Sequence, residues 1–420
     1  ERTVGWHGTY VADPLSTLLK IVACGAVAVA FLYGHGYLQV RSILKGEYYV
    51  LGLFALLGVM VLASANSLGT LSLGVELLAL SLYALVAFNR DSGIAAEAAI
   101  KYFVLGSIAS GALLYGMSIL YGVTGSLELG VISNAALQMP AGQIGLLFGL
   151  AFIVVGVAFK FGAVPFHAWV PDVYHGAPTP VTLFLAAAPK LGSFALAFRL
   201  LAEGLGAVHA TGWQDMITMV AVLSIIVGNV VAIAQTNIKR MLAYSTISHV
   251  GFILLGILAG TSQGYAAALY YTITYVIMSV GGFGMIILLS RKGFEADSLE
   301  DFKGLNARSP WFAAVMLMLM FSMAGVPPFV GFWAKLAVIQ AVLDIGSLWL
   351  AILAVTLSVV GAYYYLRVVK LMYFDEPTDK AALQGGGGAM RFVLSLNGLA
   401  VLALGLYPGL LLALCARVIP

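Results

Sequence analysis

The sequence predicts an all-α, multi-pass membrane protein. Of its 420 residues, 61% are hydrophobic and 9% are charged, whereas soluble domains carry about 25% charged residues. The mean hydropathy is +1.00. Apolar runs of the length that spans a bilayer, about 20 residues, recur along the whole chain. A helical bundle surrounded by lipid therefore fits this composition.

About twelve segments are apolar enough to cross a membrane, two of them interrupted. The connections between them are mostly short, which predicts one compact bundle. The predicted segments are 15–34, 49–65, 67–88, 98–121, 145–169 (broken), 179–201, 217–235, 243–259, 265–289, 311–345 (broken), 347–372 and 391–418.

The basic residues predict the orientation of the bundle. The loops after odd-numbered segments hold thirteen: Arg41, Lys45, Arg90, Lys239, Arg240, Arg291, Lys292, Lys303, Arg308, Arg367, Lys370, Lys380 and Arg391. The opposite side holds four, which are Arg2, Lys20, Arg199 and Arg417. Because Lys and Arg concentrate on the cytoplasmic side, both ends of the chain are expected on the periplasmic side. We interpret Lys239 and Arg240 as interfacial anchors.

The first interrupted segment carries the most informative residues. Lys160 and Lys190 lie inside two apolar runs that are separated by the proline-rich stretch 162–180. A lysine far from a helix end costs about 2.5–3.5 kcal/mol to insert into hydrocarbon. Irregular backbone at membrane depth is tolerated only where protein buries it or where it lines a cavity. The combination predicts a charge that acts near the middle of the membrane.

A second break resembles the first. Gly325, Pro327, Pro328 and Gly331 interrupt the run 311–345, and Lys335 follows. The two breaks lie five segments apart, so consecutive five-helix units would enter the membrane in opposite senses, as in inverted-repeat transporters. We predict repeats at 49–201 and 217–372, followed by a C-terminal helix at 391–418. A proline kink without function is the alternative for either break alone.

Glu76 lies near the centre of the segment 67–88 and has no neutralising neighbour in sequence. An unpaired carboxylate in hydrocarbon must be protonated or face a cation. We propose Lys160 as its partner, in a proton relay, because a buried lysine can release its proton near neutral pH and an arginine cannot. An ion pair that only locks two helices is the alternative.

Several histidines are secondary candidates. His249 lies inside the segment 243–259 and either carries protons or only packs. His167 and His175 flank Asp172 at the cytoplasmic end of the broken segment, where they form an entry path or an ordinary loop cluster. Lys101 lies close enough to the cytoplasmic face for its ammonium to reach water. No cofactor-binding or metal motif is present in the sequence. We therefore expect the energy for moving charge across the membrane to come from an ion gradient or from a partner protein.

Four motifs are long and specific: AVPFHAWVPDVYHGAPTPV (163–181), AAAPKL (186–191), QTNIKRMLAYSTISHVGF (235–252) and AGVPPFVGFWAKL (324–336). The chain resembles, over essentially its whole length, the antiporter-like, proton-translocating membrane subunits of respiratory complex I, the NADH:quinone oxidoreductase. That resemblance implies a fold of fourteen helices, of which the twelve predicted here would be the third to the fourteenth, with about two N-terminal helices missing.

The resemblance also implies roles for residues and partners. Glu76 and Lys160 would form a modulating pair, and Lys190 and His249 would connect them to Lys335. Other membrane-arm subunits would surround the chain in the bacterial inner membrane, among lipids. NADH, FMN, iron–sulfur clusters and quinone would bind to partner subunits, with no cofactor or metal in this chain.

Two other functions remain open. A subunit of a multisubunit cation/proton antiporter shares the broken helices and the lysines but has no redox partner. A membrane scaffold, in which the lysines only hold helices together, is the third possibility.

Overall fold

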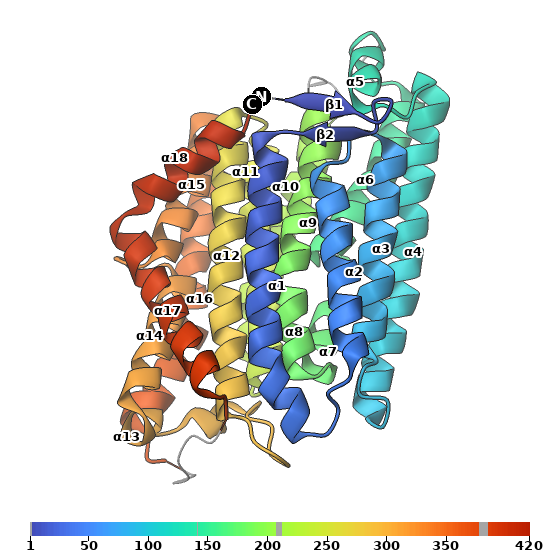
Figure 1. Ribbon diagram of the computed structural model, residues 1–420. Helices are drawn as coiled ribbons and strands as arrows, with labels where there is room; N and C mark the ends of the chain where they lie inside the picture. Colours follow the sequence, from blue (N-terminus) through green and yellow to red (C-terminus); the bar gives the residue numbers. More distant parts are fainter. Residues whose placement is uncertain (1, 141, 207–211, 378–384) are drawn as a thin grey trace.

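A computed structural model describes residues 2–140, 142–206, 212–377 and 385–420. The predicted fold class is confirmed, because long helices make up nearly all of the described chain (Figure 1). Eleven helical segments in these ranges are long and apolar enough to cross a membrane. They are α1 (Pro14–Val40), α2 (Gly46–Ala63), α3 (Leu68–Val86), α4 (Gly93–Thr124), α6 (Ile144–Phe161), the run Thr179–Glu203, α10 (Trp213–Ile233), α11 (Ile238–Leu258), α12 (Ser262–Leu289), α16 (Leu348–Phe374) and α17 (Gly388–Leu406).

The predicted segment 311–345 consists of two half-helices, α14 (Pro310–Ala324) and α15 (Val330–Asp344). The remaining helices are shorter and lie at the ends of the bundle or within its breaks. They are α5 (Leu129–Leu137), α7 (Trp169–Gly176), η3 (Leu299–Phe302), α13 (Leu305–Arg308) and α18 (Pro408–Val418).

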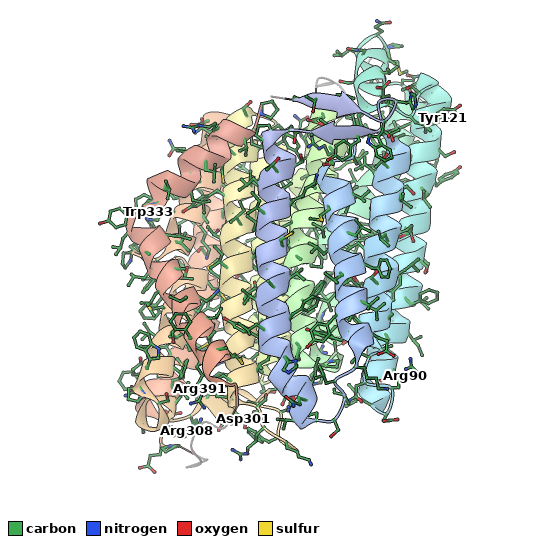
Figure 2. The ribbon with its side chains drawn as sticks, viewed as in Figure 1. Arg90, Tyr121, Asp301, Arg308, Trp333 and Arg391 are labelled. Atoms are coloured by element: carbon green, nitrogen blue, oxygen red, sulfur yellow. The ribbon has the colours of Figure 1, made fainter. Side chains whose placement is uncertain are left out.

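Two short strands were not predicted. β1 (Thr3–Gly5) and β2 (Tyr10–Ala12) form an antiparallel hairpin at the end of the bundle where α18 also finishes (Figure 1). Their apolar positions are too few to give a recognisable alternation. The basic residues Arg90, Arg308 and Arg391 lie at the opposite end (Figure 2). Lys380, which the orientation argument also uses, lies outside the described residues.

Both predicted breaks are confirmed, and each begins at a glycine. α6 ends at Gly162 and α14 ends at Gly325, with φ angles of 77° and 88°. This left-handed conformation suits glycine because it has no Cβ, and it ends a helix by redirecting the chain. Prolines follow at once and prevent either helix from continuing, since they lack the backbone N–H.

Two segments predicted as continuous are also interrupted. The run Thr179–Glu203 divides at Ala187 into α8 (Thr179–Ala186) and α9 (Ala188–Ala197), and then finishes as the π-helix η1 (Phe198–Glu203). Pro189, two residues after Ala187, has no backbone N–H to continue the helical hydrogen bonds. The C-terminal segment divides at Tyr407, immediately before Pro408 begins α18.

The centre of the bundle is formed by α8, α9, α11 and α12, whose apolar windows are at least 94% buried. Around them stand helices that are buried on one side only, such as α1, α16 and α17, with exposed leucine, isoleucine and phenylalanine side chains on the other. A helix that is apolar on every side belongs in a core or in lipid. Charged side chains on the central helices therefore lie far from bulk water.

Candidate functional site

The first break is contacted by the lysine of the following segment. Lys190, 1% exposed, donates from its ammonium to the carbonyl oxygen of Phe161 at 2.7 Å. Phe161 is the last residue of α6, so this carbonyl has no partner within its own helix. A cation at a helix C-terminus is stabilised by the helix dipole, by about 0.3–2 kcal/mol. The α6 C-terminus and Lys190 thus form a polar contact inside the bundle.

The second break has the same contact. Lys335 donates to the carbonyl oxygen of Ala324, the last residue of α14, at 2.8 Å. It also donates to the hydroxyl of Ser358 at 2.8 Å. Each lysine therefore binds the carbonyl of the residue before a left-handed glycine. At the first break this contact is made by Lys190 of the following segment and not by Lys160, which lies within the broken segment itself.

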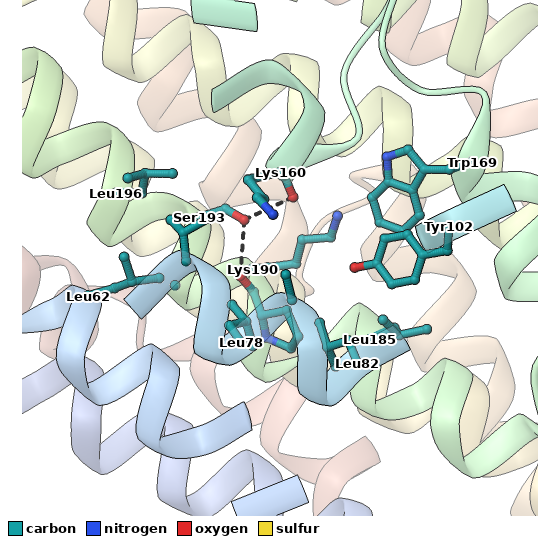
Figure 3. A pocket seen from close by; sticks show the side chains of 14 residues that line it. Leu62, Leu78, Leu82, Tyr102, Lys160, Trp169, Leu185, Lys190, Ser193 and Leu196 are labelled. Atoms are coloured by element: carbon teal, nitrogen blue, oxygen red, sulfur yellow. Dashed lines mark hydrogen bonds between the residues drawn. The ribbon is translucent and has the colours of Figure 1, made fainter. Parts of the chain in front are cut away.

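Lys160 lies on the other side of the first break. Its ammonium donates to the hydroxyl of Ser110 at 3.3 Å, and its backbone carbonyl accepts from Ser193 at 3.0 Å. Figure 3 shows Lys160 and Lys190 lining the same pocket, with Ser193, Trp169 and Tyr102 around them. Two lysines from different segments thus share one buried space.

That space is a cavity of about 20 Å³. A water molecule needs roughly 10–15 Å³ of such space and two to four polar partners. Lys160, Lys190 and Ser193 supply polar groups, and leucines from α2 and α3 supply much of the apolar wall (Figure 3). The cavity that both lysines line has room for about one water, which could carry a proton from one lysine to the other.

Glu76 makes no direct ion pair with Lys160 within 4 Å in the described part of the chain. Its Oε1 is buried and has no hydrogen-bond partner among the described residues. Since no hydrogen bond or ion pair between described residues joins the two side chains, any influence of Glu76 on Lys160 acts through space.

His249, 3% exposed, lies in a cluster of hydroxyl groups. Nδ1 shares a hydrogen bond with the Tyr271 hydroxyl at 2.7 Å, and Nε2 shares one with the Tyr365 hydroxyl at 2.9 Å. The Tyr365 hydroxyl continues to Ser245 at 2.5 Å. A neutral imidazole donates from one nitrogen and accepts at the other, so His249 can pass a proton between its two tyrosines.

The candidates for an entry path lie in a charged cluster around α7, which contacts the ends of α4 and α11. Asp172, on α7, pairs with Lys101 and with Arg240, each at 2.8 Å. Burial raises the pKa of Asp172, but the hydrogen bonds from these two cations lower that pKa by more, so the net shift is downward. Burial, together with nearby Lys239 and Arg240, lowers the pKa of His175. Burial lowers the pKa of His167.

Two basic residues lie deeper than the sequence predicted. Lys239, expected as an interfacial anchor, is 2% exposed and donates to the carbonyl of Ala177 at the end of α7 at 2.7 Å. Arg199, counted among the residues of the periplasmic side, is 1% exposed. Each residue lies at the end of an apolar run, where a basic side chain normally reaches the membrane surface. The groups that bury them lie 62 and 186 residues away in the sequence, so their burial could not be predicted.

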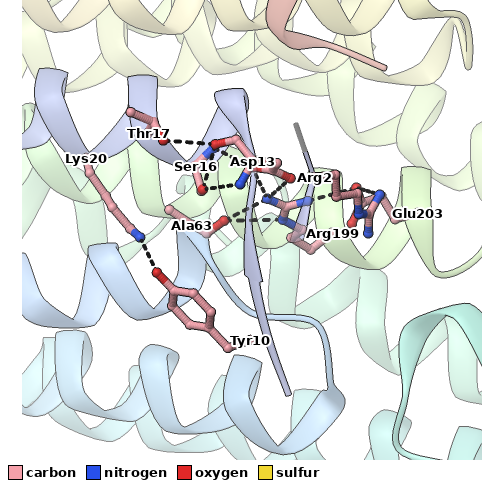
Figure 4. A network of polar contacts seen from close by, with 9 residues as sticks. All are labelled: Arg2, Tyr10, Asp13, Ser16, Thr17, Lys20, Ala63, Arg199 and Glu203. Carbon is pink, nitrogen blue, oxygen red and sulfur yellow. Dashed lines mark hydrogen bonds and ion pairs between the residues drawn. The ribbon is translucent and has the colours of Figure 1, made fainter. Parts of the chain in front are cut away.

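Arg199 holds three helix ends together. It donates to both carboxylate oxygens of Asp13, at 3.0 and 2.8 Å, and to the carbonyl of Ala63 at 2.8 Å. It also pairs with Glu203 at 2.7 Å, and Glu203 receives a hydrogen bond from Arg2 (Figure 4). The sequence does hold one indication of this cluster: Arg199 and Glu203 are four residues apart, a spacing at which opposite charges on a helix can pair.

The arrangement suits proton transfer. Burial disfavours an ammonium ion, whereas a helix C-terminal carbonyl favours it, so the two effects oppose each other at these lysines. Lysine, histidine and tyrosine side chains can all bind and release protons. Among the described residues, no group of three or more His, Cys, Asp or Glu side chains is placed to hold a metal ion.

Comparisons with known proteins agree with this chemistry. Residues 65–361 match the family model of the NADH:quinone oxidoreductase/Mrp antiporter transmembrane proteins. The chain is 64% identical, over all of its length and 87% of the relative, to a protein of Thioalkalivibrio sulfidiphilus named NADH-quinone oxidoreductase subunit N.

Solved structures have the same fold. A chain of respiratory complex I from Thermus thermophilus matches with a TM-score of 0.84 and 33% identity, over 99% of this chain and 89% of that one. A chain of the Mrp complex from a Dietzia species matches with a TM-score of 0.85 and 24% identity, over 97% and 83%. The second likeness concerns the fold alone.

Proposed function

Since the chain belongs to the NADH:quinone oxidoreductase/Mrp antiporter family of membrane proteins, we propose that it is a proton-translocating membrane-arm subunit of a bacterial NADH:quinone oxidoreductase. The high identity to a subunit N over the whole chain supports this assignment. The observation that carries the mechanism is that two lysines bind the C-terminal ends of broken helices. Lys190 binds the end of α6, and Lys335 binds the end of α14.

A subunit of a cation/proton antiporter is the second candidate. The Mrp chain has the same fold, but at 24% identity it carries no argument about function. The relatives named subunit N are more than twice as similar in sequence. The redox-coupled subunit is therefore the better-supported function.

In the proposed path, protons move through side chains and not through a continuous pore. Glu76 modulates Lys160 through its charge, Lys160 exchanges a proton with Lys190 across the small cavity, and His249 connects Lys190 to Lys335. Loss of the proton from Lys190 or Lys335 removes a charge from a helix C-terminus, which weakens the contact with the carbonyl. Each proton transfer to or from Lys190 or Lys335 therefore changes the contact between that lysine and the end of the broken helix.

We also infer that 49–201 and 217–372 are inverted repeats. The two glycine-terminated breaks, each contacted by a lysine, support this relationship. The basic residues support a cytoplasmic location for the end of the bundle that holds Arg90 and Arg308, with the opposite end periplasmic, in the inner membrane (Figure 2).

The energy for transport is expected to come from partners. We propose that neighbouring membrane-arm subunits contact the chain within the lipid bilayer, and that NADH, FMN, iron–sulfur clusters and quinone bind to other subunits. Moving one charge against 100 mV requires about 2.3 kcal/mol. That amount is similar to the free energy needed to insert one lysine into hydrocarbon. A change in the surroundings of a single buried lysine therefore involves enough free energy to drive the transfer of one proton.

The test is proton pumping by the reconstituted complex that contains Lys190→Met or Lys335→Met. Methionine keeps the length of the side chain but cannot carry a proton. We expect fewer protons pumped per NADH oxidised, with the complex still assembled. Unchanged pumping in both assembled variants would overturn the relay. Lys370→Met, which removes a lysine that is 62% exposed near the end of α16, serves as the control.

A further inference from the structure

The fully buried helix α11 carries a line of polar side chains on one face. Lys239, Thr246 and His249 are spaced seven and three residues apart, and they are 2%, 1% and 3% exposed. At 1.5 Å per residue, Thr246 lies about 10 Å beyond Lys239 along the axis and about 4.5 Å before His249. Burying three polar groups in line is unfavourable unless each has a partner.

Each of these residues has a partner from a neighbouring element. Lys239 binds the carbonyl of Ala177, at the end of α7. Thr246 shares a 2.7 Å hydrogen bond with the hydroxyl of Tyr275 on α12, and donates to the carbonyl of Leu242. The Tyr275 ring lies 5.3 Å from the imidazole of His249, centroid to centroid.

A further hydroxyl reaches this line from the cytoplasmic side. Tyr174 lies on α7, which packs against α11, and its side chain is completely buried. Its hydroxyl makes no hydrogen bond among the described residues, so it is an unpartnered donor on the helix that packs against α11. A buried hydroxyl without a firm partner is unfavourable by about 1–3 kcal/mol. This group therefore needs a reason beyond packing.

The cytoplasmic end of the line is charged. Glu295 accepts hydrogen bonds from Tyr37 and Thr179, pairs with Arg41, and interacts electrostatically with Lys239. Its side chain is 29% exposed, so it has contact with water. Protons can thus arrive at the surface end of the same face that leads inward to His249.

We propose that Thr246 and Tyr275 are relay residues that carry protons from the cytoplasmic side, by way of Tyr174, to His249. The inference rests on the proposed proton-translocating function and adds an entry branch to it. A hydroxyl group has one hydrogen and two lone pairs. The Thr246 hydrogen first rotates from the carbonyl of Leu242 toward Tyr275. Thr246 then accepts a proton from the Tyr174 side while its own hydrogen passes to the oxygen of Tyr275.

The next transfers leave every hydroxyl with one hydrogen and His249 with one additional proton. Tyr271 and Tyr365 are hydrogen-bonded to His249, and the Tyr275 ring lies 5.3 Å from its imidazole. The hydrogen of Tyr275 passes to one of these hydroxyls, and that hydroxyl protonates the imidazole. No bond other than O–H and N–H bonds changes, and no electron is transferred.

The experiment compares isosteric variants in the assembled, reconstituted complex. Thr246→Val keeps the shape and removes the hydroxyl, whereas Thr246→Ser keeps the hydroxyl and removes the methyl group. Tyr275→Phe removes only a hydroxyl. The rate of NADH-driven proton pumping is measured with a pH-sensitive dye, alongside the rate of NADH oxidation.

We expect Thr246→Val and Tyr275→Phe to pump about tenfold more slowly or worse, since proton transfer by a positioned group contributes about 10²–10⁴-fold. Thr246→Ser should restore pumping. A packing role gives the opposite order, with Val tolerated and Ser impaired, and that order would overturn the proposal. Thr272→Val and Tyr270→Phe are matched controls on α12. Both residues are buried, and the Thr272 hydroxyl donates to the carbonyl of Ala268 within its own helix.

His249→Leu separates this proposal from the function on which it rests. If His249→Leu lowers pumping and neither Thr246→Val nor Tyr275→Phe does, the entry branch is wrong and the proposed function stands. If His249→Leu, Lys190→Met and Lys335→Met all leave pumping unchanged in assembled complexes, both proposals fail. Slow pumping in the His249, Thr246 and Tyr275 variants supports both.

Discussion

Lys190, on α9, donates to the carbonyl oxygen of Phe161 at 2.7 Å. Phe161 is the last residue of α6, where the preceding segment is broken. Lys335 makes the corresponding contact with Ala324 at the second break, at 2.8 Å. In both places a helix ends at a left-handed glycine, which leaves terminal carbonyls without intrahelical partners. The backbone break and the lysine therefore form one unit, and each explains why the other is tolerated inside a membrane.

The glycines at these ends are expected to resist substitution. A Cβ at Gly162 would lie 2.5 Å from Val170, and a Cβ at Gly325 would lie 2.8 Å from the Lys335 side chain. We expect Gly162→Ala and Gly325→Ala to destabilise the protein by about 1–3 kcal/mol, because the left-handed conformation strains any residue with a Cβ. Thermal unfolding of the purified protein measures this.

The control for the glycine variants is Gly111→Ala on α4. Its added Cβ would meet nothing within 4 Å, and its φ is not positive. Alanine there should be neutral or stabilising by up to about 1 kcal/mol. Equal unfolding temperatures for all three variants would contradict the role given to the glycine ends.

The ion pair between Arg199 and Asp13 gives a second prediction. Arg199→Met leaves the carboxylate of Asp13 buried without its cation, and breaking a buried pair in this way costs about 3–5 kcal/mol. Adding Asp13→Asn removes the stranded charge while keeping an N-cap side chain, so the double variant should recover most of the loss. A double variant less stable than Arg199→Met alone would refute this explanation.

Stability should depend on pH through Asp172. Its pKa in the folded protein lies below its usual value, because the hydrogen bonds from Lys101 and Arg240 outweigh the effect of burial. The stabilisation is therefore present above about pH 4 and is lost as the pH falls through the folded-state pKa. At pH 7, Asp172→Asn should lower the free energy of unfolding by up to about 1 kcal/mol.

Unfolding measured between pH 7 and pH 3 tests this sign. The difference between the native protein and Asp172→Asn should narrow as the pH falls below about 4. A difference that grows toward acid pH would show that the carboxylate does not gain from its two cations.

Much of the candidate site could be predicted from the sequence because a charge in an apolar run is conspicuous. Glu76, Lys160, Lys190 and Lys335 all stand out in this way, and the breaks at Gly162 and Gly325 are marked by adjacent prolines. The same logic located twelve spanning segments, since the length of an apolar run relates directly to membrane thickness.

The remainder depends on contacts between distant parts of the chain. Nothing near Lys190 in the sequence indicates that it reaches Phe161, 29 residues earlier and in another segment. Arg199 pairs with Asp13, which is 186 residues away. The sequence therefore did not show that this arginine is buried, and it was counted with the basic residues at one end of the bundle. The break at Ala187 has no glycine, and the three-residue strands of the hairpin have too short a pattern to be recognised.

Glu76 offers a test of coupling through space. Glu76→Gln keeps the shape and removes the negative charge that acts on Lys160. We expect proton pumping to slow by about fivefold or more, as a loss of about 1 kcal/mol implies. Glu97→Gln, which changes an acid that is 67% exposed, is the control. Normal pumping by the Glu76 variant would mean that its charge has no part in the relay.

The central claim is that Lys335 both binds the end of α14 and releases its proton during each cycle. Lys335→Arg separates these roles, because arginine keeps a cationic donor but does not deprotonate in proteins. The measurement is proton pumping per NADH oxidised by the assembled complex, with Lys101→Arg as the control. The account predicts that Lys335→Arg assembles and loses pumping as Lys335→Met does; pumping at the native ratio would contradict it.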